Sequence, residues 1–218
     1  MGYNIAIDGP AGAGKSTIAK LVAKKKGYIY VDTGAMYRGL AIHFLKKGIG
    51  SDDVAAIEAA CEDAEVTIGY ENGMQQVYVN GENITANLRK EEVGDMASKT
   101  SGIPKVRATL MNLQQTMART KDVVMDGRDI GTVVLPNADV KVYLTASVPC
   151  RAKRRYLELQ QKGENCNLEE ITKEIEERDY RDMHREVAPL RQAEDAVLVD
   201  SSDMTIEEVA DTICRLCK

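Results

Sequence analysis

Residues 9–16 read Gly-Pro-Ala-Gly-Ala-Gly-Lys-Ser and satisfy the pattern G-x-x-x-x-G-K-[ST]. Glycines in such a segment let the backbone turn its N–H groups inward, around the oxygens of a phosphate. The Lys15 ammonium can reach the outer phosphates of a nucleoside triphosphate, and the Ser16 hydroxyl can ligate Mg²⁺. The sequence therefore predicts a nucleotide-binding P-loop made of Gly9, Pro10, Ala11, Gly12, Ala13, Gly14, Lys15, Ser16 and Thr17.

The segments around this loop agree with that interpretation. A short apolar strand is expected over residues 4–8, and Ile18, Leu21 and Val22 have helical spacing within residues 16–26. The phosphates would then lie at the positive end of a helix. The loop indicates nucleotide binding, not a reaction. The N-K-x-D string of GTP-dependent switches does not occur in the sequence, whereas an ATPase motor or an assembly factor remains possible.

Arginines in three settings could serve phosphoryl transfer, which needs cations around the transferring group more than it needs covalent chemistry. Arg is suited to this role because it stays charged and binds phosphate with two N–H groups. The first setting, residues 32–38, follows a predicted strand at residues 29–31. Ligands of open α/β sheets bind at the carboxyl ends of strands, so Thr33 and Arg38 are candidates. The alternative is a helix cap and a surface arginine.

The second setting is Asp126-Gly127-Arg128-Asp129, after an apolar strand at residues 123–125. Asp126 could organise Mg²⁺ through water, as a Walker-B Asp does. Arg128 could bind the phosphate of an acceptor. A plain turn is the alternative.

The third setting is a pair of charged helices, expected at residues 149–162 and 168–184. One helix carries arginines on adjoining turns, and the other has four charged residues on one face. Ion pairs at i, i+4 would equally suit a solvated helix. A mobile arm that closes over the P-loop and excludes water favours the functional alternative. The residues concerned are Arg151, Arg154 and Arg155, and Arg178, Arg181, Asp182 and Arg185.

Short apolar strands that alternate with helices predict an α/β fold with a parallel sheet covered on both faces. Further strands are expected at residues 140–144 and 196–199, and further helices at 34–47, 51–63, 90–100, 104–121 and 205–216. Residues 65–83 differ, because Asn72-Gly73 and Asn80-Gly81 favour tight hairpins of an antiparallel sheet. Asn167 with Glu170, and Thr205 with Glu208, predict two helix caps.

Composition limits the class of protein. The 218 residues are 44% hydrophobic and 29% charged, with a net charge of −5, as in an ordinary globular protein that is no general nucleic-acid binder. No apolar run approaches the ~20 residues of a membrane span, and no signal peptide is recognisable, so a cytoplasmic protein is expected. Five scattered cysteines suit reduced thiols. Cys214 and Cys217 fit one helical turn better than a redox or metal site.

The sequence resembles the bacterial-type cytidylate kinases, a family of nucleoside monophosphate kinases. The matching segments are IDGPAGAGKST, DTGAMYR, PKVR, DGRDIGTVV and ERDYRDMHREVAPL, in that order along the chain. The resemblance implies a P-loop kinase fold with a five-stranded parallel sheet in a core of residues 1–62, 103–148 and 186–218. It also implies a small antiparallel-sheet insert for the acceptor nucleotide at 63–102 and a helical lid at 149–185.

The same resemblance implies a role for each matching residue. Arg38, Arg128 and Arg185 would bind the acceptor phosphate, Ser98, Arg107 and Asp129 the cytosine, and Arg178 and Asp182 the ribose. Arg154 would lie near the donor and, with Lys15, Arg128 and Arg185, take part in catalysis. Thr33 stands where many relatives have Ser, and keeps the hydroxyl. An oxygen acceptor can distinguish the N4 amino group of cytosine from the O4 of uracil.

The expected reaction transfers the γ-phosphoryl group of ATP, bound with Mg²⁺, to CMP and to dCMP, as a step of pyrimidine nucleotide metabolism. A monomer without nucleic-acid or membrane partners is expected. Two alternatives remain: a kinase of the same architecture with another acceptor, such as UMP, AMP or a small metabolite, and a P-loop switch or assembly protein that binds nucleotide to change partners.

Overall fold

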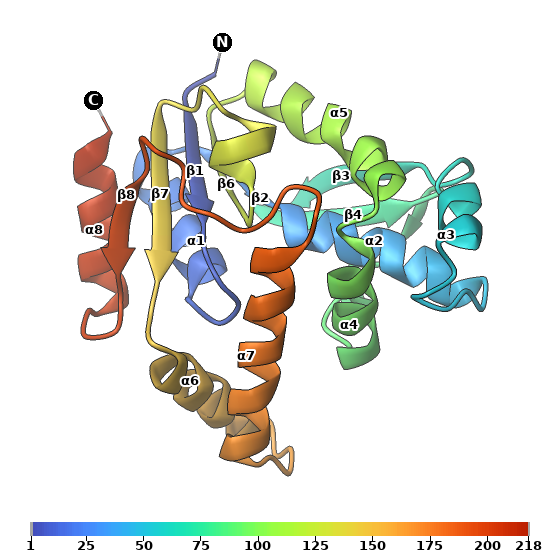
Figure 1. The fold of residues 1–218 in the computed structure, drawn as a ribbon. Coiled ribbons are helices and arrows are strands. Elements are labelled where there is room, and N and C mark those ends of the chain that lie inside the picture. Colours follow the sequence, from blue (N-terminus) through green and yellow to red (C-terminus); the bar gives the residue numbers. More distant parts are fainter. Residues whose placement is uncertain (1, 218) are drawn as a thin grey trace. The chain divides into compact units, whose positions relative to one another are not determined.

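The computed structural model describes residues 2–217 and divides into two compact units (Figure 1). The first, here called the P-loop unit, comprises Gly2–Tyr30 and the chain from Lys121 onward. The second, the middle unit, comprises Val31–Thr120. Within residues 2–217 no helix is long and apolar enough to span a bilayer.

A five-stranded parallel sheet with strand order β2-β6-β1-β7-β8 confirms the predicted fold class. Its central strand β1 (Asn4–Asp8) pairs in parallel with β6 (Val123–Gly127) and with β7 (Val140–Thr145). The two remaining strands are β2 (Ile29–Asp32) and β8 (Val197–Asp200). Continuous apolar runs form β1 and β6 because a parallel sheet is covered on both faces. The register sets Ile7 opposite Asp126, so β1 and β6 end side by side.

Four α-helices of the P-loop unit accompany this sheet. They are α1 (Lys15–Lys26), α6 (Val148–Gln161), α7 (Leu168–His184) and α8 (Ile206–Leu216). The apolar faces of α1 and α8 share one core with β1 and β7, which includes Ile18, Val22, Leu144 and Ile213. Of the Cys-x-x-Cys pair, Cys214 lies in the last turn of α8 and Cys217 is its C-cap, which agrees with the predicted position at a helix end.

Two caps were predicted, and one is formed differently. Thr205 and Glu208 form the expected capping box at the start of α8. Asn167 does cap α7, but its side chain accepts from the Glu169 N–H at 2.8 Å, and the predicted pairing with Glu170 is wrong. The structure also contains a short π-helix, Ile130–Val134, that the sequence pattern did not indicate.

The middle unit combines helices with the predicted antiparallel sheet, which is formed by β3 (Val66–Glu71), β4 (Met74–Val79) and β5 (Glu82–Asn83). Both Asn-Gly pairs adopt positive φ: Asn72 51° and Gly73 75°, then Asn80 51° and Gly81 80°. Positive φ at both central residues is the requirement of a type I′ turn, which explains the two tight hairpins.

The helices of the middle unit are α2 (Thr33–Lys46), α3 (Val54–Ala60), α4 (Glu91–Thr100) and α5 (Pro104–Thr120), with a 3₁₀ turn at Thr85–Asn87. Helix α3 is shorter than the expected 51–63: it starts later because Asp53 caps it, accepting from the Ala56 N–H at 3.0 Å, and it ends at Ala60. Helix α2 lies against β4 (Figure 1): a Cβ at Gly39 would be 3.1 Å from Val77 Cγ1.

Candidate active site

The P-loop connects β1 to α1, and its glycines are required by its shape. Gly9, Gly12 and Gly14 have φ of 151°, 73° and 87°. A Cβ on Gly9 would also lie 1.9 Å from the carbonyl oxygen of Leu144. Gly14 is the N-cap of α1, so the amides at the start of that helix adjoin the loop. This is the geometry in which backbone N–H groups and a helix N-terminus bind phosphate.

Lys15 is buried in the loop, with 6% of its surface exposed. Its Nζ donates to the carbonyl oxygen of Pro10 at 2.7 Å. Burial, together with repulsion from Arg128, lowers the pKa of Lys15 well below its ordinary value. The oxygens of a bound triphosphate would oppose both effects, because they restore the solvation and the opposite charge that the ammonium lacks.

Asp126 lies at the end of β6, next to the first turn of α1. Its Oδ2 accepts from the Ser16 hydroxyl at 3.1 Å, and its Oδ1 accepts from the Tyr30 hydroxyl at 2.9 Å. A hydroxyl beside a carboxylate is a ligand set that suits Mg²⁺, which usually binds one or two carboxylates and completes its shell with water and phosphate. Among residues 2–217 no group of three His, Cys, Asp or Glu side chains could hold a metal alone. The two residues fit a cation that arrives with the nucleotide.

Asp8, the last residue of β1, holds the segment that carries Arg128 and Asp129. Its carboxylate accepts from the backbone N–H groups of Ile130, at 2.8 Å, and of Gly131, at 2.7 Å. Burial raises the pKa of Asp8 from 3.8 to about 6. Sequence reasoning missed this residue, although an acid at the end of a buried strand, directly before the glycine-rich loop, was a usable signal.

Two ion pairs join the turn after β6 to the end of α7. Arg128 Nε lies 2.8 Å from Asp182 Oδ2, and Arg185 Nη2 lies 3.3 Å from Asp129 Oδ1. Arg185 Nε also donates to the carbonyl oxygen of Ala188 at 2.8 Å. The structure therefore brings four of the predicted site residues together from segments more than 50 positions apart in sequence.

Each partner of the Arg128–Asp182 pair shifts the pKa of the other toward the charged form. Burial disfavours the ionised form of Asp182, but Arg128, Arg178 and Arg185 lower its pKa below the ordinary value. Burial likewise disfavours the charged form of Arg128, and Asp182 and Asp126 raise its pKa. Arg178 is half-buried on α7 and contributes to the lowered pKa of Lys15. Hence Lys15, Arg128 and Arg178 lie close enough in the P-loop unit to influence one another, with the carboxylates of Asp126 and Asp182 among them.

Arg154, predicted to lie near the donor, is anchored to the segment after β8. Its Nη2 donates to the carbonyl oxygen of Ser201 at 2.7 Å, and its Nη1 lies 3.3 Å from the Ser201 hydroxyl. This contact joins α6 to the carboxyl end of an edge strand.

The remaining predicted residues belong to the middle unit, where α2, α4 and α5 hold them. Thr33 begins α2 and is buried, and Arg38 follows one turn later. Ser98 lies on α4 with a buried Oγ that has no hydrogen-bond partner. Arg107 on α5 donates to the carbonyl oxygen of Ser101 at 3.3 Å, and its guanidinium lies over the ring of Tyr37 at 5.8 Å.

Gln75 of β4 fixes the start of α2 and was not identified from the sequence. Its side-chain oxygen accepts from the Asp32 N–H at 2.9 Å, while its NH₂ donates to the Asp32 carbonyl oxygen at 3.0 Å. The Asp32 side chain in turn accepts from the Ala35 N–H at 2.9 Å. The hairpin thereby positions the segment that carries Thr33 and Arg38.

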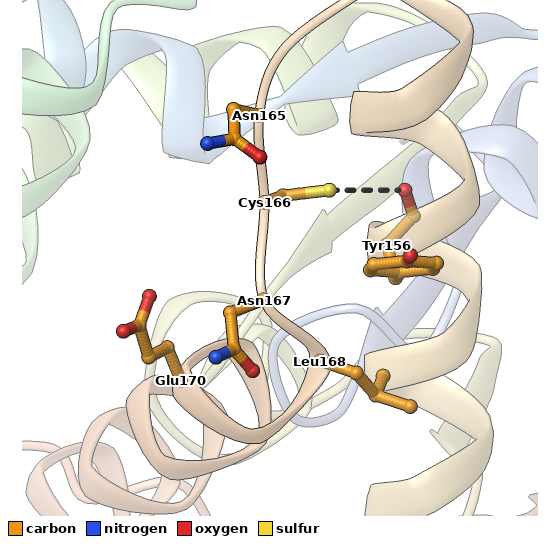
Figure 2. A pocket seen from close by; sticks show the side chains of 6 residues that line it. All are labelled: Tyr156, Asn165, Cys166, Asn167, Leu168 and Glu170. Atoms are coloured by element: carbon orange, nitrogen blue, oxygen red, sulfur yellow. Dashed lines mark hydrogen bonds between the residues drawn. The ribbon is translucent and has the colours of Figure 1, made fainter.

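A separate pocket of about 640 Å³ lies where α6 connects to α7 (Figure 2). None of the predicted site residues lines it, and none of its lining side chains is cationic, so phosphate has no counter-charge there. The residues that line it are Tyr156, Asn165, Cys166, Asn167, Leu168 and Glu170.

Comparison with known proteins identifies the family. A family model described as "Cytidylate kinase" matches residues 5–218. The chain belongs to the cytidylate kinase family. It is 50% identical over 213 residues to a cytidylate kinase of Caldicellulosiruptor saccharolyticus, covering 98% of this chain and 94% of that protein. It is 51% identical over 212 residues to a cytidylate kinase of Ligilactobacillus salivarius, covering 97% of this chain and 95% of that protein.

The fold agrees with this family. A crystal structure of shikimate kinase from Bacteroides thetaiotaomicron matches with a TM-score of 0.50 and 14% identity, over 98% of this chain and 97% of that chain. At this identity the likeness concerns the fold, which is that of a P-loop kinase. As a cytidylate kinase family member, the chain is an enzyme that transfers a phosphoryl group.

The raised pKa of Asp8 predicts a specific pH dependence of stability. Between pH ~4 and ~6 folded Asp8 keeps a proton that the unfolded chain has released, so its contribution to stability falls as the pH rises. A change from 3.8 to about 6 corresponds to a loss of up to about 3 kcal/mol. Denaturant unfolding from pH 4 to 7.5 should show the wild type losing stability relative to Asp8→Asn. Parallel pH profiles for the two proteins would contradict this.

Proposed function

We propose that the protein transfers the γ-phosphoryl group of ATP to CMP, and also to dCMP, giving ADP with CDP or dCDP, as a step of cytoplasmic pyrimidine nucleotide metabolism. The observation that carries this proposal is the group of cations beside the P-loop: buried Lys15, with Arg128 and Arg178 close enough to affect its pKa and Arg185 held nearby by Asp129. Phosphoryl transfer between two polyanions requires such cations, because charge spreads over the oxygens of the transferring group.

The donor site would be the P-loop. Its amides and Lys15 would bind the β and γ phosphates of ATP, while the Ser16 hydroxyl and, through water, Asp126 would hold Mg²⁺. When bound, Mg²⁺ neutralises charge on the β and γ oxygens. The distance of 3.1 Å between the Ser16 and Asp126 oxygens supports this assignment. Arg154 is assigned to the donor as well.

The acceptor phosphate would be bound by Arg128 and Arg185, with Arg38 of the middle unit assigned to the same phosphate through the family resemblance. A phosphate dianion can take over guanidinium N–H groups that now serve carboxylates, since Arg binds both anions in the same two-pronged way. Arg178 and Asp182 would then bind the ribose, and Thr33, Ser98, Arg107 and Asp129 would complete the nucleoside site.

The chemistry needs little from a general base. A nucleoside monophosphate is already largely ionised at neutral pH, because the second pKa of a phosphate monoester is about 6. An acceptor oxygen would attack the γ-phosphorus in line, and Lys15, Arg128 and Arg185 would stabilise the transferring group. We assign residues 63–102 to the acceptor insert and residues 149–185 to a lid whose closure excludes water, with residues 1–62, 103–148 and 186–218 as the core of a monomer.

Replacement of either Arg128 or Arg185 by Ala should lower kcat by about 10³, if these residues act as arginine fingers do. Steady-state turnover with ATP, Mg²⁺ and CMP would measure the effect. Arg191→Ala is the matched control, because this arginine is exposed after α7 and should keep the wild-type rate. Wild-type turnover in both variants would reject the assignment.

A panel of acceptors decides the substrate. With ATP and Mg²⁺, ADP release should be fastest with CMP and dCMP and roughly tenfold or more slower with UMP, given ~1–3 kcal/mol for one base contact. UMP or AMP exceeding CMP would overturn the base assignment. Slow hydrolysis that does not respond to CMP would instead favour the switch or assembly alternative.

Ser98→Ala tests base recognition separately. A buried hydroxyl without a partner costs stability, on the order of 1 kcal/mol, so removing it should leave the unfolding free energy equal or higher. The same variant should raise KM for CMP and narrow the preference for CMP over UMP. A variant that is less stable and keeps the wild-type KM would show that Ser98 serves the fold instead of the base.

A further inference from the structure

A buried ion pair binds the backbone of P-loop residue Ala11 on both sides. The Ala11 N–H donates to Asp179 Oδ1 at 3.3 Å, and the Ala11 carbonyl oxygen accepts from Arg151 Nη1 at 2.9 Å. Arg151 Nη1 also lies 2.6 Å from Asp179 Oδ2. The three groups therefore close a ring of hydrogen bonds around one residue of the nucleotide-binding loop.

The pair is built into the packing of α6 and α7. The side chains of Arg151 and Asp179 are 4% and 11% exposed. Arg151 Nε donates to the carbonyl oxygen of Ala146 at 2.8 Å, which fixes the guanidinium plane. A Cβ on Gly12 would lie 3.3 Å from Arg151 Cβ, so α6 packs directly on the loop. The proposed mechanism gives neither residue a role.

Asp179 and Asp182 lie one turn apart on α7 and serve different parts of the site. Asp182 holds Arg128, which is assigned to the acceptor phosphate, whereas Asp179 holds the loop assigned to the donor. Residues three apart share a helix face, so α7 presents both carboxylates to the same side. Loss of the Asp179 contact should therefore affect the donor loop while the Arg128–Asp182 pair persists.

We propose that Arg151 and Asp179 are positioning residues that set the conformation of the P-loop at Ala11 and thereby tie the helical arm of α6 and α7 to donor binding. This rests on the proposed use of ATP as the donor. A loop without these two contacts must be ordered by the nucleotide itself, and the cost of that ordering appears as weaker donor binding. Acceptor binding does not require the loop to be ordered again, so the affinity for the acceptor should not change.

The test compares Arg151→Met, Asp179→Asn and the double variant with the wild type. Calorimetric titration with a non-hydrolysable ATP analogue and Mg²⁺, without acceptor, should give a donor Kd raised tenfold or more in each single variant. The double variant should be no more than threefold worse than the worse single variant, because the two residues act as one unit. KM for CMP at saturating ATP should stay within threefold of the wild type.

Lys162→Met is the matched control, because Lys162 and Glu158 form an exposed pair at the end of α6 with an N···O distance of 2.6 Å. It should leave the donor Kd unchanged. Arg151→Lys keeps the charge but cannot reach Ala146, Ala11 and Asp179 together, so it should not restore donor binding. Asp179→Asn preserves the shape of the side chain and decides the matter if Arg151→Met does not fold.

Two results would overturn the proposal. One is a donor Kd within threefold of the wild type in Asp179→Asn. The other is a rise in KM for CMP parallel to the rise in donor Kd, which indicates a general structural role. If the wild type binds the ATP analogue but phosphorylates no CMP, the proposed acceptor fails while the donor titration still decides the role of the pair.

Discussion

Burying positive charge is the constraint on which the site depends. Phosphate binding favours desolvated cations, but a buried cation without a counter-charge is costly. The chain meets both demands by giving each of three arginines its own carboxylate: Arg128 with Asp182, Arg185 with Asp129, and Arg151 with Asp179. Lys15 differs, because its ammonium donates to the Pro10 carbonyl oxygen, and burial together with Arg128 lowers its pKa. In the proposed donor site, its ammonium is the group that would gain most from a bound phosphate.

The carboxylates of the site also hold the ends of β1 and β6 and helix α7 together. Three carboxylates come from buried ends of strands, Asp8 from β1 and Asp126 and Asp129 from β6 and its turn, and two more come from one face of α7. The parallel register places the ends of β1 and β6 together, and Asp8 then fixes the turn after β6 by two backbone hydrogen bonds. The arginines are thus oriented by groups that are themselves held in place, which is the preorganisation that phosphoryl transfer uses.

The sequence predicted those helices and turns whose formation depends on interactions between neighbouring residues. The Asn-Gly pairs predicted the hairpins because type I′ turns need positive φ at both central residues, and Asn167 marked the observed start of α7. The P-loop followed from its glycines and Lys15. Contacts between residues far apart in the sequence could not be predicted. Gln75 binds Asp32 across 43 positions, and Asp8 binds Gly131 across 123. No periodicity encodes such pairs, so the contacts of Asp8, Gln75 and Asp179 could not be predicted, although the place of Asp8 directly before the loop was a usable signal for that residue. The π-helix after Asp129 was missed for the same reason, since its start depends on the Asp8 carboxylate.

In the proposed function, one set of cations gathers two polyanions so that a phosphoryl group passes between them. Its most direct test is a calorimetric titration with adenosine and cytidine joined through their 5′ positions by five phosphates. This compound should bind at least a hundredfold more tightly than ATP or CMP alone, and Arg128→Ala should remove most of the gain. Binding no tighter than that of ATP, or a gain that survives the loss of Arg128, would contradict it.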